Sequence, residues 1–414
     1  MNICFDIIKE IFYNLNLKSQ IRLIQTNKYS NKNLQITDFY NINKNLQQKL
    51  EDNILINYKY IEKLNAQWNN KIKNIYYLTN LRILNCIQNR SIDDKDIWNL
   101  NLIELYLSTS TIRNISHLTN LRKLVIQDFS KIDDNSIENL TNLEILYIES
   151  NQYISKINHL TKLKKLKCNH SNITDEEIQN LDLIELNVNN NPNIKNINHL
   201  TNLKKLSCAR FSNVSDENIV NLTNLIQLNI NDNTKITNIN HLTKLLTLMC
   251  HSNSSITDIS KLDLIYLDAS YECGIKNINH LSNLQELYCS DIKCQIADSN
   301  INGNSLTKLN VNNNTNIKNI NHLTKLKNLI CEMNSNVENS GIKNLNLKSL
   351  SVFDNPKITN ISHMTNLDTL YCPYNSGITN SSIQNLNLTK LMSEGNYKIK
   401  NVSHMNNLIF CDLD

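Results

Sequence analysis

The segment INHLTNLKKLSC, from Ile197 to Cys208, returns along this chain almost letter for letter. Close copies begin at Ile157, Ile239 and Ile320, and looser copies begin at Ile115, Ile278 and Ile361. The copies recur about every 41 residues, and each interval holds two similar halves, so the basic repeat is about 20 to 22 residues long. A repeat this short cannot bury its apolar side chains alone and must stack on its neighbours. The sequence therefore predicts a solenoid.

Each repeat contains a short stretch in which apolar and polar residues alternate. One half reads L-x-x-L-x-C and the other reads L-x-x-L-x-V/I, so the last two apolar side chains point to the same side of an extended strand. We expect successive strands to pair in parallel, and an asparagine after the strand to satisfy backbone groups where the chain turns. These asparagines are Asn69, Asn151, Asn191, Asn233, Asn314, Asn355 and Asn396.

With this pattern, residues 59–414 resemble a leucine-rich-repeat protein of about 18 repeats. The resemblance implies an α/β solenoid, with a curved parallel sheet on the concave face and 3₁₀ or short helices on the convex face. Arcs such as IKNINHL, which are similar to those of internalins, alternate with arcs such as ITDEEIQNL (173–181). The second kind predicts a one-turn helix, with Thr174 as the N-cap and Glu177 completing a capping box.

Cysteine and histidine recur at fixed positions, but not at the spacing that shared chemistry needs. Cysteines such as Cys208 and Cys250 occupy the second inward strand position in every second repeat, which separates neighbours by about 9.6 Å at about 4.8 Å per strand. A disulfide needs Cα atoms within about 7 Å, and zinc–sulfur bonds are about 2.3 Å long. We interpret these cysteines as small buried hydrophobic residues. The convex histidines, such as His199, are interpreted as rings bonded to backbone.

Charge, hydropathy and motifs exclude several functions. The net charge is only +4 over 414 residues, and lysines are interleaved with acids, so we expect no nucleic acid as a partner. The sequence contains no apolar run of about 18 residues, so we predict no membrane span. The first residues lack the basic-then-apolar layout of a secretory signal. Motifs for phosphate binding, metalloprotease or hydrolase chemistry and C-x-x-C are missing, so we predict no enzyme, no metal and no cofactor. We expect an intracellular, cytoplasmic chain with reduced thiols.

The concave face is the expected site for a protein partner. Aromatic side chains exposed on a rigid sheet are typical anchors at protein interfaces, and lysines lie between them. Neighbouring Lys and Glu side chains on this face are expected to neutralise one another, with less than about 1 kcal/mol per pair. The predicted partner-binding residues are Tyr106, Lys123, Tyr147, Lys165, Lys167, Lys205, Tyr266, Tyr288, Phe353 and Tyr371.

Residues 1–58 lie before the repeats and predict amphipathic helices. The plain interpretation is a cap that shields the first repeat. The stretch also resembles an F-box, which implies docking on the Skp adaptor of a cullin-type ubiquitin ligase, with the repeats selecting the substrate. The matching residues at the adaptor-binding positions are Ile3, Ile7, Ile8, Ile11, Phe12, Leu15 and Leu23. The Asn- and Ile-rich composition is similar to that of leucine-rich-repeat and F-box proteins of amoebae and their large DNA viruses, which would place a viral chain in host cytoplasm.

Three functions therefore stay open. The first is a non-enzymatic, F-box-type substrate adaptor, and the second is a binding scaffold or regulator whose N-terminal helices are only a cap. The third, an internalin-like surface adhesin, requires export. The final strand, near Phe410, presents an uncapped sheet edge, so we also expect fraying there or association with another copy.

Overall fold

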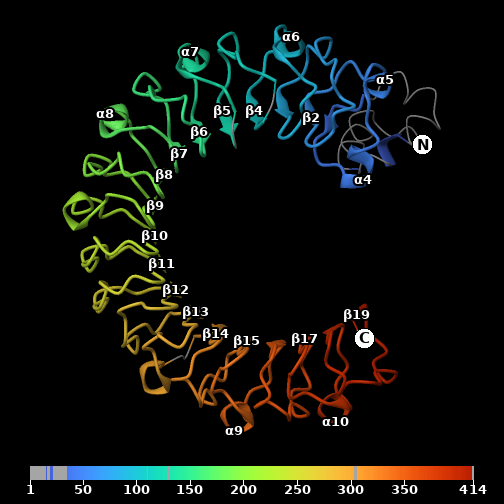
Figure 1. Ribbon diagram of the computed structural model, residues 1–414, viewed down its shortest axis with the longest axis vertical. Coiled ribbons are helices and arrows are strands. Elements are labelled where there is room, and N and C mark those ends of the chain that lie inside the picture. The colour runs from blue at the N-terminus through green and yellow to red at the C-terminus, as the bar shows by residue number, and fades with distance from the viewer. Residues whose placement is uncertain are drawn as a thin grey trace, which may run out of the picture. The chain divides into compact units, whose positions relative to one another are not determined.

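The chain folds into two stacks of parallel strands. The computed structural model describes residues 15, 19–21, 35–109, 111–127, 130–302 and 305–412. It divides into two compact units, Met1–Ile194 and Lys195–Asp414. Within each unit, strands line the inner edge of an arc and most of the short helices lie along its outer edge (Figure 1).

The first unit contains strands β1 to β8, and each one pairs in parallel with the next. The strands are β1 (Asp38–Phe39), β2 (Lys63–Asn65), β3 (Ile83–Asn85), β4 (Glu104–Leu107), β5 (Lys123–Ile126), β6 (Ile145–Ile148), β7 (Lys165–Lys167) and β8 (Glu185–Asn187). The helices are α4 (Lys44–Gln47), α5 (Asp52–Leu55), α6 (Asp94–Ile97), α7 (Asp134–Ile137) and α8 (Asp175–Ile178).

The second unit contains strands β9 to β19, again paired in parallel and in sequence order. They are β9 (Lys205–Ser207), β10 (Gln227–Asn229), β11 (Thr247–Met249), β12 (Tyr266–Asp268), β13 (Glu286–Tyr288), β14 (Lys308–Asn310), β15 (Asn328–Ile330), β16 (Ser349–Ser351), β17 (Thr369–Tyr371), β18 (Lys390–Met392) and β19 (Phe410–Asp412). Its helices are η1 (Asp216–Asn218), η2 (Asp298–Asn300), α9 (Asn339–Ile342) and α10 (Asn380–Ile383).

Leucines hold the strands in register. The central leucine of one strand aligns with that of the next, as Leu228 does with Leu248 and Leu248 with Leu267, and all three are fully buried. The residues on either side of each leucine point outward and are half-buried, as in β10 and β11. Burying a leucine contributes about 1.5–3 kcal/mol, so this repeated column accounts for much of the stability of each unit.

The predicted asparagine ladder is confirmed. All seven predicted asparagines are buried, and Asn233 shows their role: its Nδ2 donates to the carbonyl oxygens of Cys208 (2.7 Å) and Val214 (3.1 Å) in the preceding repeat. Other repeats hold serine at this position. Ser171, for example, donates from its hydroxyl to the Cys168 carbonyl of its own repeat (2.8 Å). Asparagine thus joins neighbouring repeats, whereas serine closes its own.

The convex arcs are built as predicted in one respect and differently in another. Each described arc histidine with a recorded ring bond makes it to an isoleucine carbonyl of the preceding repeat; His322 Nε2, for example, donates to Ile301 O (2.9 Å). Thr174 is the N-cap of α8 by its backbone, but its side chain makes no capping bond. Glu177 instead accepts from the backbone N–H groups of Ile157 (2.7 Å) and Asn158 (3.1 Å). The predicted capping box is wrong because the preceding repeat competes for this carboxylate.

The region before residue 59 already takes part in the sheet. Strand β1 pairs with β2, and Asn69 of the first predicted repeat donates to the carbonyl oxygens of Gln47 (2.6 Å) and Leu50 (2.8 Å). Residues near α4 therefore shield the first repeat. Of the F-box-like residues, Leu15 is half-buried, and Ile3, Ile7, Ile8, Ile11, Phe12 and Leu23 lie outside the described residues. No described helix has the length and apolar character needed to cross a bilayer.

Candidate functional site

The candidate site is the set of side chains that point outward from the strands. We define the strand face as the first and third residues of each strand and the residue two positions further on. All ten predicted partner-binding residues lie on it; Lys205 is exposed and the other nine are half-buried. Their role in binding stays a prediction. They form small clusters within each unit.

In the first unit, Tyr106 is held between a carboxylate and an ammonium group. Its hydroxyl donates to Glu104 Oε2 (2.6 Å), and Lys123 Nζ lies 4.9 Å from its ring centre and 3.9 Å from Glu104 Oε2. The ring also contacts Tyr40, with centres 6.1 Å apart. Burial, together with the bond to Glu104, raises the pKa of the Tyr106 phenol far above its ordinary value, so the hydroxyl stays protonated.

The other lysines of this unit's strand face are also engaged within the sheet. Lys167 Nζ lies 4.4 Å from the ring centre of Tyr147 on the preceding strand. Lys165 pairs with Glu185 at 3.9 Å. These contacts agree with the expectation that charges on this face neutralise one another, and such exposed pairs contribute less than about 1 kcal/mol each. The face therefore presents rings covered by their own lysines.

The second unit repeats the arrangement at β13 and β14. Lys308 Nζ lies 5.1 Å from the ring centre of Tyr288 and 3.5 Å from Glu286 Oε2. Tyr266 stands beside Tyr288, with ring centres 5.4 Å apart. The sequences of the two sites match. Both contain Glu-Leu-Tyr, at 104–106 and at 286–288, and in both the next strand places a lysine opposite the glutamate. We call this arrangement a Glu–Tyr–Lys triad.

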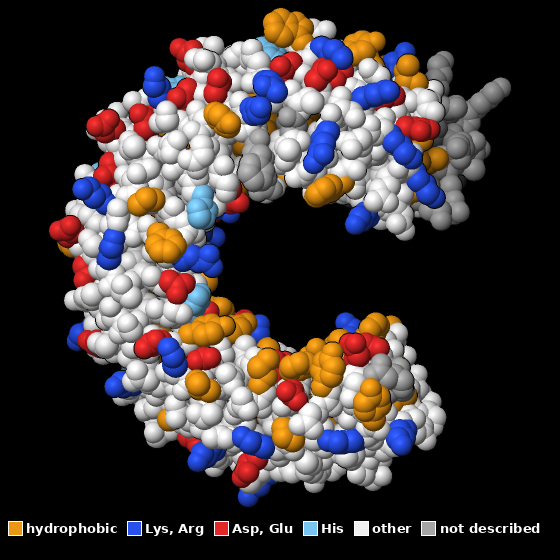
Figure 2. Space-filling model, in the orientation of Figure 1, with side chains coloured by type: hydrophobic (Ala, Val, Ile, Leu, Met, Phe, Trp, Pro, Cys, Tyr) orange, Lys and Arg blue, Asp and Glu red, His pale blue; other side chains and the backbone are white. Residues whose placement is uncertain are grey.

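A second aromatic cluster in this unit has a different form. Phe353 and Tyr371 stack nearly parallel, with ring centres 6.1 Å apart and planes at 10°. Tyr374 meets Phe353 edge-on at 5.4 Å and is 51% exposed. Sequence reasoning missed Tyr374 because it lies beyond the strand, at a left-handed position (φ 53°). Figure 2 shows hydrophobic side chains gathered along the inner edge of this part of the second unit, with acidic side chains among them.

The cysteines are free and, apart from exposed Cys411, buried throughout the described residues. Two of them, Cys273 and Cys294, take the position that asparagine or serine holds in other repeats. Cys273 Sγ therefore comes within 3.6 Å of Cys250 Sγ in the preceding repeat. The spacing of the recurrent strand cysteines does not predict this approach. The signal was available, since Cys273 follows the end of its strand by five residues, as the ladder serines Ser335 and Ser376 do.

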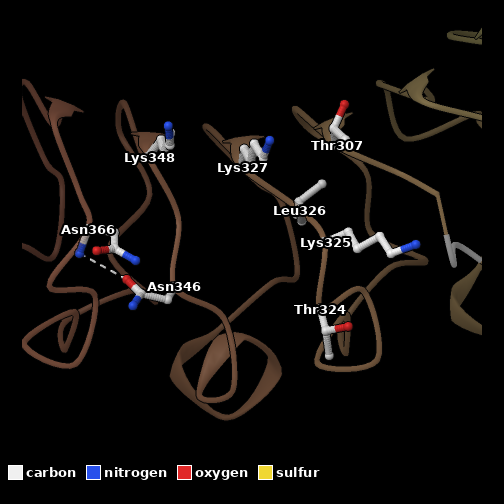
Figure 3. Close-up of a pocket in the computed structure, with 8 residues that line it drawn as sticks. All are labelled: Thr307, Thr324, Lys325, Leu326, Lys327, Asn346, Lys348 and Asn366. Carbon is white, nitrogen blue, oxygen red and sulfur yellow. Dashed lines mark hydrogen bonds between the residues drawn. The ribbon is translucent and has the colours of Figure 1, made fainter.

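One hollow lies on the second unit, where the chain enters β14 to β16. It has a volume of about 310 Å³, and Thr307, Lys325, Lys327 and Lys348 are among its lining residues (Figure 3). Lys327 and Lys348 hold the same position in successive repeats and Lys325 lies two residues before Lys327, and the three side chains do not converge on one point. We assign no ligand to it. Among the described residues, no three His, Cys, Asp or Glu side chains are arranged to hold a metal ion.

Comparisons with known proteins identify a fold but no family. No protein-family model matches the chain, and no curated protein matches it. A solved leucine-rich-repeat protein of Leptospira interrogans is 22% identical, covers 90% of this chain and 98% of its own, and has a TM-score of 0.50. An internalin of Listeria monocytogenes is 24% identical over 66% of this chain and 87% of its own, with a TM-score of 0.42. The predicted leucine-rich-repeat solenoid is confirmed.

Proposed function

We propose that this protein is a non-enzymatic recognition protein that binds a protein partner through its strand face. The observation that supports the proposal most is the set of half-exposed aromatic rings held on a paired, rigid sheet. Rings such as Tyr147, Tyr266 and Phe353 are fixed by neighbouring side chains and by strands in register. They lose little conformational freedom on binding, which favours aromatic anchors at interfaces.

Two sets of substitutions test this proposal. The strand-face variant carries Tyr147→Ala, Tyr266→Ala and Phe353→Ala. The matched control carries Trp98→Ala, Tyr153→Ala and Tyr397→Ala, which remove aromatic residues that are 65%, 55% and 75% exposed and lie off the strand face. Proteins captured by the full chain from cells of the natural source are compared by mass spectrometry, with circular dichroism as a check on folding. We expect a partner that the control retains and the strand-face variant loses. A partner retained equally by both variants would contradict the proposal.

A finer proposal is that the protein is an F-box-type substrate adaptor. The F-box-like residues Ile3 to Leu23 support it, and such a role places the protein in the cytoplasm, or in host cytoplasm if the chain is viral. Ile8→Asp with Ile11→Asp should abolish binding to the Skp adaptor in a pull-down and leave the repeats folded. If the adaptor does not bind the unsubstituted chain, or binds the variant equally well, the adaptor role is refuted.

The alternative is a binding scaffold whose N-terminal region is only a cap. The bonds from Asn69 to Gln47 and Leu50 favour a capping role for the α4 region. Deletion of residues 1–50 should then lower stability and solubility, since it removes both acceptors from a buried amide. Under this alternative the captured partner is retained by the truncated chain, whereas an adaptor loses its Skp partner.

A further inference from the structure

The cluster of Phe353, Tyr371 and Tyr374 differs from the other aromatic sites of the strand face in one respect. In the two Glu–Tyr–Lys triads, the lysine on the next strand lies over the tyrosine and is held there by the aligned glutamate. At β17 the corresponding sequence is Thr369-Leu370-Tyr371, and the aligned residue on β18 is Lys390. The tyrosine and the lysine are kept, but threonine replaces the glutamate.

This replacement leaves the aromatic cluster uncovered. Lys390 is exposed, and among the described residues no lysine or arginine nitrogen is recorded over the rings of Phe353, Tyr371 or Tyr374. Other lysines of these repeats are bonded elsewhere: Lys357 Nζ donates to Ser335 O (3.0 Å) and Lys398 Nζ to Ser376 O (2.9 Å). In the triads a lysine of the chain itself covers the tyrosine ring. Among the described residues, no lysine or arginine does so for this cluster.

Two carboxylates flank the same rings. Glu332 is oriented by Ser351, whose hydroxyl donates to it, and by Asn312 Nδ2 (3.3 Å), and Glu394 is exposed on β18's side of the cluster. Neither forms an ion pair within 4.0 Å among the described residues. Burial, and then the negative charge of Glu332 and the neighbouring Tyr374 and Glu394, raise the pKa of the Tyr371 phenol. A cation placed at these rings would meet negative charge on both sides.

The next repeat makes room for the cluster. Gly395 (φ 68°) is the one glycine among the left-handed positions of the described chain, and a Cβ there would lie 2.8 Å from Cδ1 of Tyr374. Side chains occupy this position in the other described repeats, so the glycine allows the Tyr374 ring to lie against the following backbone. A larger residue at this position would displace the edge-on ring from the cluster.

Stacked aromatic rings bordered by carboxylates are suited to a cation, because ring faces and carboxylates both attract positive charge. We propose that the cluster of Phe353, Tyr371, Tyr374, Glu332 and Glu394 binds an arginine or lysine side chain from a basic segment of a protein partner. The inference rests on the proposed function, and it names the chemistry of the contact. The ligand's cation takes the place that the lysine occupies in a Glu–Tyr–Lys triad.

A fluorescein-labelled peptide of four Arg-Gly repeats is the probe, and its citrulline counterpart, which keeps the shape and loses the charge, is the control. Fluorescence anisotropy with the full chain should detect the arginine peptide and much weaker binding of the citrulline peptide. Phe353→Leu with Tyr371→Leu should weaken arginine-peptide binding by about two- to fivefold per ring. The matched variant Tyr266→Leu with Tyr288→Leu should not weaken it, because Lys308 already covers Tyr288. Equal binding of the two peptides, or equal loss in the two variants, would overturn the proposal.

The variant Thr369→Glu gives the sharpest test. It restores the missing glutamate, so Lys390 should move over Tyr371 and exclude the peptide, although the variant adds a negative charge. Weaker binding supports the proposal. Tighter binding would show that the carboxylates attract the peptide without the rings, and would refute it. If capture of a partner depends on the strand face while the two peptides bind alike, this inference fails and the proposed function stands. If the arginine peptide binds selectively and no partner depends on the strand face, the cluster does bind a cation and the proposed function fails.

Discussion

Replacement of Asn233 by alanine tests whether the asparagine ladder holds successive repeats together. The substitution removes the donor to the carbonyl oxygens of Cys208 and Val214, two residues that are fully buried. A buried acceptor left without a partner costs about 1–3 kcal/mol, so two of them give about 2–6 kcal/mol. Local relaxation favours the lower half of this range, and we expect the free energy of unfolding to fall by about 2–4 kcal/mol. The N–H of exposed Lys235, which the Asn233 side chain also accepts, can bond to water instead.

Urea unfolding followed by circular dichroism measures this loss, and hydrogen exchange locates it. Asn238→Ala is the matched control, since Asn238 is exposed and accepts from the Asn240 N–H nearby. We expect the control to change stability by less than about 0.5 kcal/mol. Amide protection should fall around β9 and β10 in Asn233→Ala and not in the control. If the two variants lose the same stability, the ladder does not join the repeats.

Three further predictions follow from the thiols and the last strand. Burial raises the pKa of the thiols of Cys86, Cys168, Cys208 and Cys372 from 9.0 to about 12, so between pH 9 and 12 these thiols ionise mainly in the unfolded chain. The free energy of unfolding should therefore fall over this range, by up to about 1.4 kcal/mol per pH unit for each thiol. Urea midpoints that do not change above pH 9 would contradict this prediction. Hydrogen peroxide should form a disulfide between Cys250 and Cys273, whose Sγ atoms are 3.6 Å apart. The two thiols lose two protons and two electrons, and one peroxide is reduced to two water molecules. Non-reducing mass spectrometry should detect the linked peptides in the unsubstituted chain and not in Cys273→Ser. Self-association through β19 stays a prediction: Ile409 and Phe410 are 83% and 50% exposed, and a solution mass independent of concentration would exclude it.

The fold could be predicted because its cause is local and repeated. The leucine at the paired inward position of β2 to β18 and the asparagine that recurs after many strands each leave a periodic trace in the sequence, and both predictions are confirmed. Individual side-chain partners could not be predicted in this way. Glu177 was predicted to bond within its own helix, yet its carboxylate accepts from two N–H groups of the repeat before it, because stacking places that backbone within hydrogen-bond distance.

The candidate site shows the same division. Alternation along the strands identified which residues point outward, but it could not show which of them already engage a neighbour. That depends on pairs across strands, such as Lys123 over Tyr106, and therefore on register. Tyr374 lies outside the alternating stretch and has no periodic signal. The replacement of the triad glutamate by threonine beside Tyr371 can be recognised only from the alignment of residues across neighbouring strands.

The alternation of ladder residues bears on how such a chain can change its length. A repeat with an inward cysteine and a serine in the ladder is followed by one whose asparagine bonds back to that cysteine's carbonyl, as Asn355 does to Cys331 and Asn396 to Cys372. Where the repeats alternate in this way, excising one serine repeat or one asparagine repeat would set two of the same kind against each other. Excising or duplicating two together keeps the junctions of such a stretch. A stretch of this kind can therefore gain or lose strand face in steps of two repeats, with the bonds between neighbouring repeats retained.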